Sequence, residues 1–515
     1  MDTETEPRAA APAVAPPRVE APATPIAMPA VAAVDAPAAD PVPLVVDLDG
    51  TLLRTDTLVE SLFELARSRP LQLLRLPAWL AGGRANLKRR IAQLTSIDTT
   101  LLPRADDLLA HLRVLRLQGR RLVLATAADA SIAQAVADDL GLFDAVLASD
   151  GRLNLSGAAK RDRLVAEFGE RGFDYAGNSW RDLPVWAAAR SGLLMRPSRR
   201  LAGAAGRVTQ VERVFTDGGP NRRPDSRPEW RAWLSAMRVQ HWLKNLLLLV
   251  PLLAAHQLYE PARLWAALLG LLCFSLAASG VYVLNDLFDL PADRRHPHKK
   301  ARVLASGQLS VLHALLMVPA LWGAAGLLAL GLGPPFVGAL GIYAGLMLAY
   351  SLRLKDYAVI DALVLAVGYS LRIWAGSLAV AIAVSPWLLV CSMALFFGLA
   401  LLKRYAELVT LRPRLGPHGR VRGYGVDDAA LIAGLGTAAD CIAVALLALY
   451  PVVEASGAPQ LTVWLLSALL LFWTGHMWLM AHRGRIHDEP VAFALRDPLS
   501  RAFGVAAAAV LLVAA

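Results

Sequence analysis

Two groups of carboxylates in this 515-residue chain have a spacing that could do chemistry, and the first is Asp47 with Asp49. Both directly follow the short apolar run 43–46, which has strand composition. Ligands gather at the carboxyl ends of parallel strands. Of two carboxylates placed there, one can attack a phosphorus atom while the other gives and takes the proton. Gly50 and Thr51 allow the tight turn that directs both, so we expect Asp47 and Asp49 to be catalytic.

The second group follows a long apolar run and consists of Asn285, Asp286, Asp289 and Asp293. A helix turns about 100° per residue, which places all four on one face, although Pro291 is expected to distort the last turn. Carboxylates crowded beside a membrane repel each other and are costly to desolvate. Magnesium carrying a diphosphate would satisfy them, because it prefers hard oxygen ligands and takes the remainder from phosphate and water.

Two further charges, Arg372 and Asp440, stand inside apolar runs. Each lies eleven residues beyond the first residue of its run, Asp361 or Ala429, which at 1.5 Å per residue is a depth of about 16 Å. Unpaired charges at such depth are unfavourable. We therefore expect them either to pair or to face the reaction cavity.

The first carboxylate group must be positioned by a soluble domain at 41–215. Strand-like runs at 43–46 and 121–126 enclose a long helical pattern, and this alternation favours a parallel sheet. Residues 1–40 are rich in Ala and Pro and are expected to form a disordered tail without a signal peptide. Residues 216–229 are rich in Pro, Gly and charge and predict a linker.

The second group must be positioned by membrane-spanning helices. The chain is 56% hydrophobic and 18% charged, with a mean hydropathy of +0.45, which excludes a disordered chain and disfavours an all-soluble enzyme. From residue 230 onward, apolar stretches of about 17–25 residues recur. We predict nine spans: 242–258, 263–284, 311–333, 335–351, 361–382, 386–402, 429–451, 461–481 and 499–515. The three cysteines show no metal or disulfide spacing.

Basic residues predict the orientation of these spans. If the soluble domain is cytoplasmic, seventeen Lys and Arg residues of the loops lie on its side and one, Arg263, lies opposite. The positive-inside rule then places the domain in the cytoplasm, on a multi-pass protein of the inner (plasma) membrane. The rule also accounts for much of the net charge of +10 without any nucleic-acid partner.

The string DLDGT at 47–51 resembles the first motif of the haloacid dehalogenase (HAD) superfamily of phosphatases, and the resemblance covers about 43–200. It implies an α/β, Rossmann-like parallel sheet with a helical cap at about 56–118. In this resemblance Asp47 is the nucleophile and Asp49 is the general acid and base.

Later motifs of the same superfamily are matched in order. Thr126, at the end of LVLAT, and Lys160, in SGAAKRDRL, would bind the phosphoryl group. Asp182, in GNSWRD, would join Asp47 and Asp49 as a magnesium ligand. Asn178 stands where the family usually has a further Asp, which puts metal affinity in question.

The NDxxDxxxD string and the nine spans resemble the UbiA superfamily of membrane prenyltransferases over about 230–515. This implies an all-α polytopic domain in which Asp286, Asp289 and Asp293 are catalytic and hold magnesium. YSLRLK, with Tyr350 and Lys355, matches the second family motif, but a full second DxxxD is absent.

Within that superfamily, the finer resemblance is to decaprenyl-phosphate phosphoribosyltransferases, through QHWLKN at 240–245 and the strings above. It implies that polyprenyl phosphate is joined to 5-phosphoribosyl diphosphate. The candidate substrate-binding residues of this domain are Lys244, Asn245, Asn285, Arg302, Tyr350, Lys355, Asp361 and Arg372.

The two resemblances together predict a bifunctional enzyme in which the fused phosphatase removes the 5-phosphate left on the lipid product. One alternative is prenyl transfer from a prenyl diphosphate to a small acceptor, with a regulatory or inactive HAD-like domain at the N-terminal end. A more remote alternative is a transporter, although acidic groups at the membrane edge rather than at its middle disfavour it.

Overall fold

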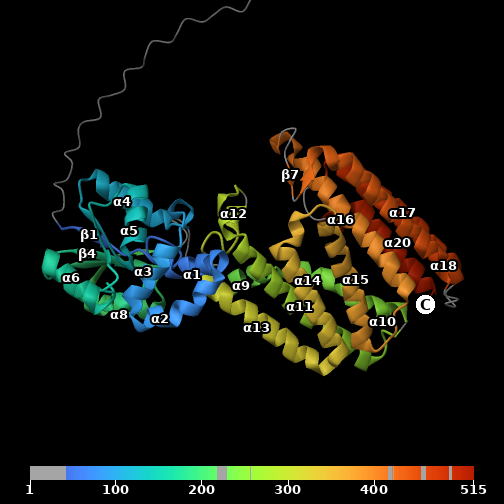
Figure 1. Ribbon diagram of the computed structural model, residues 1–515, viewed down its shortest axis with the longest axis horizontal. Helices are drawn as coiled ribbons and strands as arrows, with labels where there is room; N and C mark the ends of the chain where they lie inside the picture. The colour runs from blue at the N-terminus through green and yellow to red at the C-terminus, as the bar shows by residue number, and fades with distance from the viewer. Residues whose placement is uncertain are drawn as a thin grey trace, which may run out of the picture.

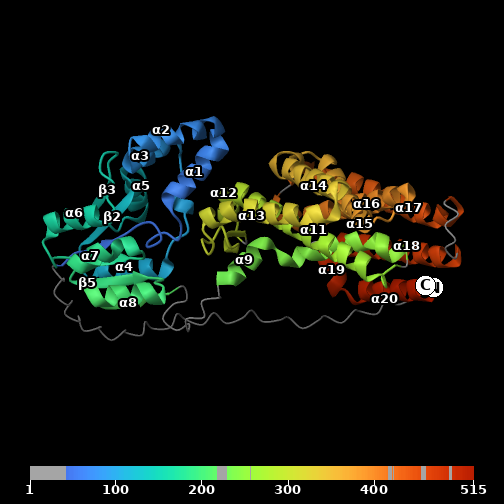
Figure 2. The ribbon, with the colours of Figure 1, turned by 90° about the horizontal axis from the view of Figure 1, so that it is seen from below.

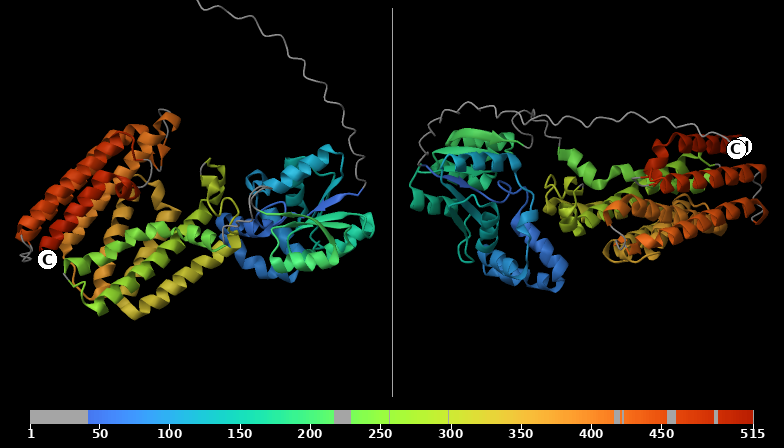
Figure 3. Two further views of the ribbon diagram at one scale, coloured as in Figure 1. Left: turned by 180° about the vertical axis from the view of Figure 1, so that it is seen from behind. Right: turned by 90° about the horizontal axis from the view of Figure 1, so that it is seen from above.

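The computed structural model describes residues 42–216, 229–255, 257–297, 299–415, 420–421, 423–453, 460–486 and 490–514. Figure 1 shows an α/β head and a helical bundle arranged end to end, and Figure 3 shows the same arrangement from behind and from above. The predicted tail at 1–40 and nearly all of the predicted linker at 216–229 lie outside the described residues.

The head is built on a six-stranded parallel sheet of order β3-β2-β1-β4-β5-β6, which confirms the predicted parallel sheet. Strand β1 pairs with both β2 and β4, so the chain order reverses at β1. Crevices form at such reversal points, at the carboxyl ends of the strands. The strands are β1 (Leu44–Val46), β2 (Leu122–Asp129), β3 (Ala145–Ser149), β4 (Asp174–Gly177), β5 (Ser191–Met195) and β6 (Gln210–Phe215).

Apolar layers cover both faces of this sheet. Leu44 and Val46 join one core cluster and Val45 joins the other, as expected for side chains that alternate across a strand. Helices α4 (Asp106–Leu117) and α5 (Ala130–Leu140) contribute to the first cluster. The second includes residues of α6 (Ala158–Phe168), α7 (Leu183–Ala188) and α8 (Arg199–Val208).

The cap consists of α1 (Thr57–Ser68), α2 (Leu76–Ala81) and α3 (Arg84–Leu94), which Figure 2 shows projecting from the sheet. Helix α4, which the predicted cap at 56–118 included, instead packs on the sheet core through Leu108, Leu109 and Leu112. The cap is therefore shorter than predicted, because three buried leucines commit α4 to the sheet.

The remainder of the described chain is helical apart from a short antiparallel pair, β7 (Arg420–Val421) and β8 (Tyr424–Gly425). It contains seven helices long and apolar enough to cross a membrane. It is therefore a multi-pass membrane domain. Its elements are α9 (Glu229–Met237), η4 (Val239–Leu249), α10 (Val250–Ala254), α11 (Pro261–Phe288), α12 (Leu290–Arg295), α13 (Val311–Ala329), α14 (Pro334–Leu352), α15 (Ile360–Val380), α16 (Pro386–Leu415), α17 (Ala429–Val453), α18 (Gln460–His482), α19 (Pro490–Arg496) and α20 (Pro498–Ala514).

The predicted count of nine spans is not confirmed. The first predicted span, 242–258, falls on the 3-10 segment η4 and the short α10, where Pro251 lies in the first turn. The two elements together form one apolar helix, Val239–Ala254, which is shorter than the seven helices that could cross a membrane. The last predicted span falls on α20, whose apolar part is Pro498–Val510.

Helix α11 ends at the acidic motif. Asp289 is the residue between α11 and α12, and Pro291 lies in the first turn of α12. The amide of Asp289 still donates to Asn285, and that of Asp293 to Asp289, at 2.9 and 2.8 Å. The distortion predicted at Pro291 is therefore a junction between two helices, across which helical backbone hydrogen bonds continue.

Candidate active sites

The first candidate site is a cavity of about 780 Å³ at the carboxyl end of β1. Asp47 and Asp49 line it, together with Lys160 from α6 and Asn178 and Asp182 from the turn after β4. Three of the four predicted motifs thus meet where the strand order reverses, although they are far apart in the chain.

Asp47 is held by two donors from different parts of the head. The Nζ of Lys160 donates to Oδ1 of Asp47 at 2.7 Å, and Oγ1 of Thr51 donates to Oδ2 at 3.3 Å. Burial raises the pKa of Asp47, while the Lys160 ammonium opposes that rise. The carboxylate is therefore nearly buried, oriented, and next to a cation that could share a phosphoryl oxygen.

Asp49 has a different environment. It accepts hydrogen bonds from the amide and hydroxyl of Thr57, at 2.8 and 3.2 Å, at the start of α1. Burial raises the pKa of Asp49 to about 7, with a further contribution from Asp56. A carboxyl group that titrates near neutrality suits proton transfer.

Asp182 is occupied by protein donors. Its Oδ2 accepts from the amides of Asn178 and Ser179 and from the Ser179 hydroxyl, at 3.1, 2.9 and 2.9 Å. Its Oδ1 accepts from the Tyr175 hydroxyl at 2.9 Å, and burial raises the pKa of Tyr175, which keeps that donor protonated. In this arrangement Asp182 does not fit a magnesium ligand, and it orients Tyr175, which in turn accepts from Lys160 at 2.9 Å.

The remaining predicted residues of the head lie around this centre. Asn178 accepts from the Thr51 hydroxyl at 3.3 Å, and its amide covers Gly50 so closely that a Cβ there would lie 2.1 Å from Nδ2. Gly50 also has a φ of +74°, which favours glycine. Thr126 is buried behind the cavity and accepts from the amide of Ala128 at 3.0 Å, so its hydroxyl does not line the described cavity.

One residue of the cavity was missed by the sequence interpretation. Lys88 of α3 reaches over the cavity and donates to the Ala127 carbonyl and to Oδ1 of Asn154, at 2.6 and 2.9 Å. Burial lowers the pKa of Lys88. The only signal for Lys88 in the sequence is its place in a run of basic residues, Arg84, Lys88, Arg89 and Arg90.

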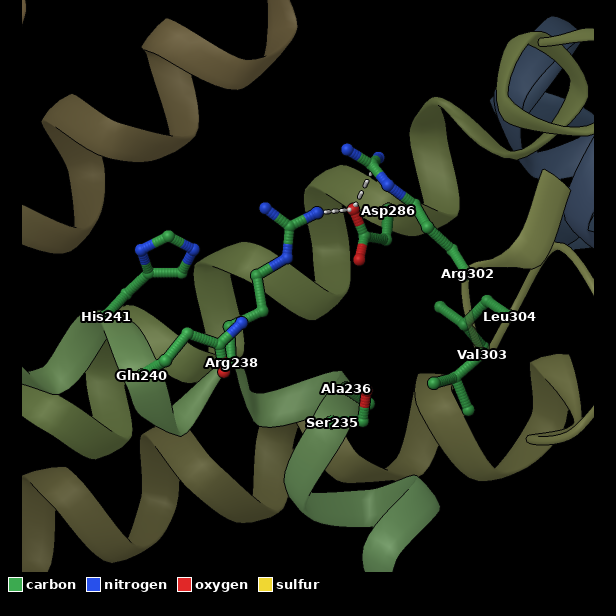
Figure 4. Close-up of a pocket in the computed structure, with 9 residues that line it drawn as sticks. All are labelled: Ser235, Ala236, Arg238, Gln240, His241, Asp286, Arg302, Val303 and Leu304. Carbon is green, nitrogen blue, oxygen red and sulfur yellow. Dashed lines mark hydrogen bonds and ion pairs between the residues drawn. The ribbon is translucent and has the colours of Figure 1, made fainter. Parts of the chain in front are cut away.

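The second candidate site is a cavity of about 200 Å³ at the end of α11 (Figure 4). Figure 4 shows the guanidinium groups of Arg238 and Arg302 both directed at Asp286. Nη1 of Arg302 lies 3.3 Å from Oδ1 of Asp286 and 2.6 Å from Oδ2 of Asp293. Two carboxylates from adjacent helices therefore converge on one cationic nitrogen.

Asp289 belongs to a separate group. It accepts from Lys355 at 2.9 Å and from Asn285 at 3.0 Å, and Lys355 also contacts Oδ1 of Asn285 at 3.4 Å. Helical periodicity explains this division, because positions 286 and 293 are nearly superimposed on a helical projection while 285 and 289 lie together to one side. The predicted polar face thus consists of two adjacent groups: Asp286 and Asp293 bind Arg302, whereas Asn285 and Asp289 bind Lys355.

The residues around Arg302 fit a divalent cation. Asp286 and Asp293 offer hard oxygen atoms, and they surround a position that a positive charge already occupies. Within the described ranges, no three His, Cys, Asp or Glu side chains form a group that could hold a metal ion. A metal here would need its remaining ligands from substrate and water, which is how magnesium is usually bound.

Arg238 is a second residue that the sequence interpretation missed. Its φ is +51°, a left-handed conformation that is unfavourable for a residue with a side chain. This backbone directs the guanidinium toward Asp286 and over the Tyr282 ring, with 5.4 Å to the ring centroid. A strained residue at a charged cavity is a common feature of functional sites.

Three predicted binding residues lie deeper or beside this cavity. Asn245 is buried and links the Ser275 hydroxyl, at 3.0 Å, to Nε of Arg372, at 2.8 Å. Arg372 also donates to the Tyr343 hydroxyl at 2.8 Å and lies over that ring. Lys244 precedes Asn245 on η4 and is half-buried.

Arg372 and Asp440, for which pairing was one expectation, do not pair with each other in the described structure. Asp440 of α17 accepts from Trp478 Nε1 of α18 at 2.7 Å. Each charge has found polar partners on neighbouring helices instead.

Tyr350 and Asp361 form part of a buried ion-pair network. Arg404 donates to both, and the Tyr424 hydroxyl donates to Asp361 at 2.6 Å. Arg404 and Asp361 have 1% and 0% of their surface exposed, so this network ties α14, α15 and α16 together. This geometry gives Tyr350 and Asp361 a structural role, which is to brace these three helices against one another through Arg404.

Comparison with known proteins assigns the membrane domain. The sequence pattern of the UbiA prenyltransferase family matches residues 246–496. A relative of Sinorhizobium fredii, named uncharacterized protein y4nM, is 35% identical over 485 residues, 92% of this chain and 91% of that protein. The chain belongs to the UbiA prenyltransferase family. It is therefore a membrane-embedded transferase, as its sequence motifs predicted.

Other relatives are similar over shorter stretches. The nodulation protein NoeC of Azorhizobium caulinodans is 33% identical over 280 residues, 52% of this chain and 90% of that protein. The decaprenyl-phosphate phosphoribosyltransferase of Corynebacterium glutamicum is 34% identical over 193 residues, 36% of this chain and 56% of that protein. The match thus spans less than two thirds of the latter relative.

Two solved structures are similar at low identity. A UbiA homologue from Archaeoglobus fulgidus, bound to DMAPP and Mg²⁺, has 18% identity and a TM-score of 0.43 over 55% of this chain and 96% of that chain. A substrate-bound phosphoserine phosphatase has 13% identity and a TM-score of 0.25 over 34% of this chain and 93% of that chain.

Proposed function

We propose that this UbiA-family transferase joins polyprenyl phosphate to 5-phosphoribosyl diphosphate in a magnesium-dependent reaction. The observation that carries the proposal is the convergence of Asp286 and Asp293 on one nitrogen of Arg302, at a cavity on the edge of the membrane domain. Supporting it, a relative at 34% identity is named a decaprenyl-phosphate phosphoribosyltransferase. We also propose that the domain spans the plasma membrane with the head on the cytoplasmic side.

In the proposed transfer, an oxygen of the lipid phosphate forms a bond to the anomeric carbon of the ribose. The bond from that carbon to the diphosphate breaks, and the diphosphate leaves with the electron pair. Magnesium held by Asp286 and Asp293 would neutralise charge on the diphosphate. Arg238 and Arg302 would turn from these carboxylates, and Lys355 from Asp289, to the phosphate oxygens. There the three cations would stabilise the leaving group electrostatically.

We further propose that the head is a phosphatase that removes the 5-phosphate from the transferred ribose. Asp47 would attack the phosphorus, the bond to the ribose oxygen would break, and Asp49 would protonate that oxygen. Lys160 would offset charge on the phosphoryl group. Water, deprotonated by Asp49, would then hydrolyse the aspartyl phosphate and restore Asp47.

The proposal is tested with detergent-purified protein, magnesium, polyprenyl phosphate and ribose-labelled 5-phosphoribosyl diphosphate. Label should enter the lipid phase, and Asp286→Asn should abolish it. Asp47→Asn should leave label entry intact but stop the later release of inorganic phosphate. Transfer from a prenyl diphosphate to a small acceptor, with no label in the lipid, would contradict the proposal and favour the prenyl-transfer alternative.

A further inference from the structure

A buried ion pair joins the head to the membrane domain. Arg294 of α12 donates to both carboxylate oxygens of Glu60 on α1, at 2.6 and 3.2 Å. The two side chains are 7% and 6% exposed. Arg294 directly follows Asp293 in the chain, so one end of the pair is anchored beside the transferase site.

The ion pair lies in an apolar contact that both parts share. Phe63 of α1 belongs to the same buried cluster as Leu287, Leu290 and Leu304 of the membrane domain. Its ring lies 6.3 Å from that of Phe288, centroid to centroid. A charge pair enclosed in this way is strongly unfavourable to break, because either partner alone would be an uncompensated buried charge.

The membrane domain also forms part of the wall of the head's cavity. Ser310, at the start of α13, lines the cavity that contains Asp47 and Asp49. Just before it, Gly307 lies against the head so closely that a Cβ would be 2.8 Å from Cβ of Arg54 and 3.0 Å from Cγ of Pro103. Gly307 has a φ of +73°, so the backbone and the close contact both require glycine.

The same contact reaches the catalytic loop of the head. The Thr55 hydroxyl donates to Glu60 at 2.6 Å, and the amide of Gly50 donates to the Thr55 carbonyl at 3.3 Å. The loop that carries Asp49 is therefore tied, through Thr55, to the residue that binds the membrane domain. Figures 1 and 2 show α1 as the part of the head nearest to α12 and α13.

We propose that Glu60, Arg294 and the segment 307–310 form a fixed docking contact that completes the head's cavity, so that the head acts on a phosphate carried by a membrane-held lipid. Glu60 and Arg294 are positioning residues in this scheme. The choice of substrate rests on the proposed phosphatase function. A head that served free metabolites would have no need of a cavity wall from the membrane domain.

Cross-linking tests the contact independently of activity. Asp98 of the head and Arg295 of α12 form an exposed pair at 3.3 Å. In a full-length variant whose free cysteines, Cys273, Cys391 and Cys441, are replaced by Ser, Asp98→Cys with Arg295→Cys should cross-link through a short bismaleimide. Asp98→Cys with Tyr259→Cys should not, because Tyr259 lies before the other end of the 28-residue helix α11.

Arg294→Gln should lower that cross-linking yield about tenfold, because it leaves Glu60 buried and unpaired. It should also lower release of phosphate from the enzyme's own labelled lipid product about tenfold, while hydrolysis of soluble p-nitrophenyl phosphate changes by less than about twofold, because docking acts through effective concentration. Arg67→Gln, at an exposed arginine of α1 that pairs with Glu64 of its own helix, is the matched control.

A second pair of variants avoids the buried charge. Gly307→Ala should reproduce the selective loss, whereas Gly333→Ala, which has a comparable φ of +90° but no contact closer than 3.8 Å, should not. Absent cross-linking in the starting protein, or equal losses on both substrates, overturns the proposal. Cross-linking without hydrolysis of either substrate would refute the proposed phosphatase function and its lipid substrate. The docking contact would then still be supported.

Discussion

Lys160 and Asp47 are 113 positions apart in the chain, yet the lysine ammonium donates to the carboxylate at 2.7 Å. Asp47 ends the central strand of the sheet and Lys160 lies in α6, which covers one face of that sheet. Both side chains are nearly buried. The pair therefore places a cation at the atom that we propose as the nucleophile.

Lys160→Met should abolish phosphatase activity, lowering the rate of p-nitrophenyl phosphate hydrolysis by about 100-fold or more. The loss follows because Asp47 would remain buried without its cation and a bound phosphoryl group would lose its counter-charge. Arg161→Met on the same helix, where the side chain is exposed and paired only with its neighbour, is the matched control. Equal rates for the two variants would remove Lys160 from the mechanism.

The phosphatase rate of the head should fall at higher pH, and this fall should depend on Asp49. Its pKa is raised to about 7, so it is protonated and able to donate below that pH and loses this ability above it. Leaving-group protonation should therefore slow as pH rises through about 7. Measuring the single-turnover rate of aspartyl-phosphate formation against pH should give a falling limb there. Asp49→Asn should lower the rate and remove the limb.

The same shift has a consequence for stability. The pKa of Asp49 in the fold lies above its ordinary value of 3.8, so its contribution to stability is fully present below that value. That contribution is lost as pH rises from 3.8 through about 7. Thermal melts of the full chain should therefore show Asp49→Asn gaining stability relative to the parent at pH 8 but not at pH 4. A constant difference across this range would contradict the shift.

The carboxylates of the membrane site should not be equivalent. Asp286→Asn and Asp293→Asn each remove an oxygen that faces Arg302, and we expect label transfer to fall about 100-fold. The magnesium concentration for half-maximal rate should rise in both. Asp289→Asn leaves that pair intact and should act mainly through Lys355, with little change in magnesium dependence. Equal magnesium shifts in all three would show that the carboxylates act as one group.

Local sequence patterns predicted much of the fold for identifiable reasons. Val45 and its neighbours are apolar because β1 is buried on both faces, and the long apolar runs are helices because a bilayer allows little else. The predicted span 242–258 was wrong because its helix ends at Ala254, so the apolar run was long enough only by residue count.

What the sequence could not supply was pairing between distant side chains. Glu60 is one of two acidic residues on the cap helix α1, and its partner Arg294 is 234 positions away. Likewise, the sequence predicts Asp361 as a substrate ligand because it does not reveal that Arg404 binds this carboxylate in the protein interior. Motifs locate reactive residues, but the tertiary fold decides which of them face a cavity and which brace the helices.

Asp361 and Arg404 provide a test of that distinction. Asp361→Asn should destabilise the membrane domain by about 1.5–3 kcal/mol, because it removes one of the two carboxylates paired with the buried Arg404 guanidinium, the other being Glu407 at 2.7 Å. Replacing both residues, as Asp361→Leu with Arg404→Met, should recover much of that loss, since apolar pairs of similar volume often replace buried ion pairs well. Asp356→Asn, on the exposed loop before α15, is the control. Thermal melts in detergent report the stability, and the transfer rate of the surviving folded protein reports the site. If the double variant is stable but cannot transfer label, Asp361 or Arg404 contacts substrate and the bracing role is insufficient.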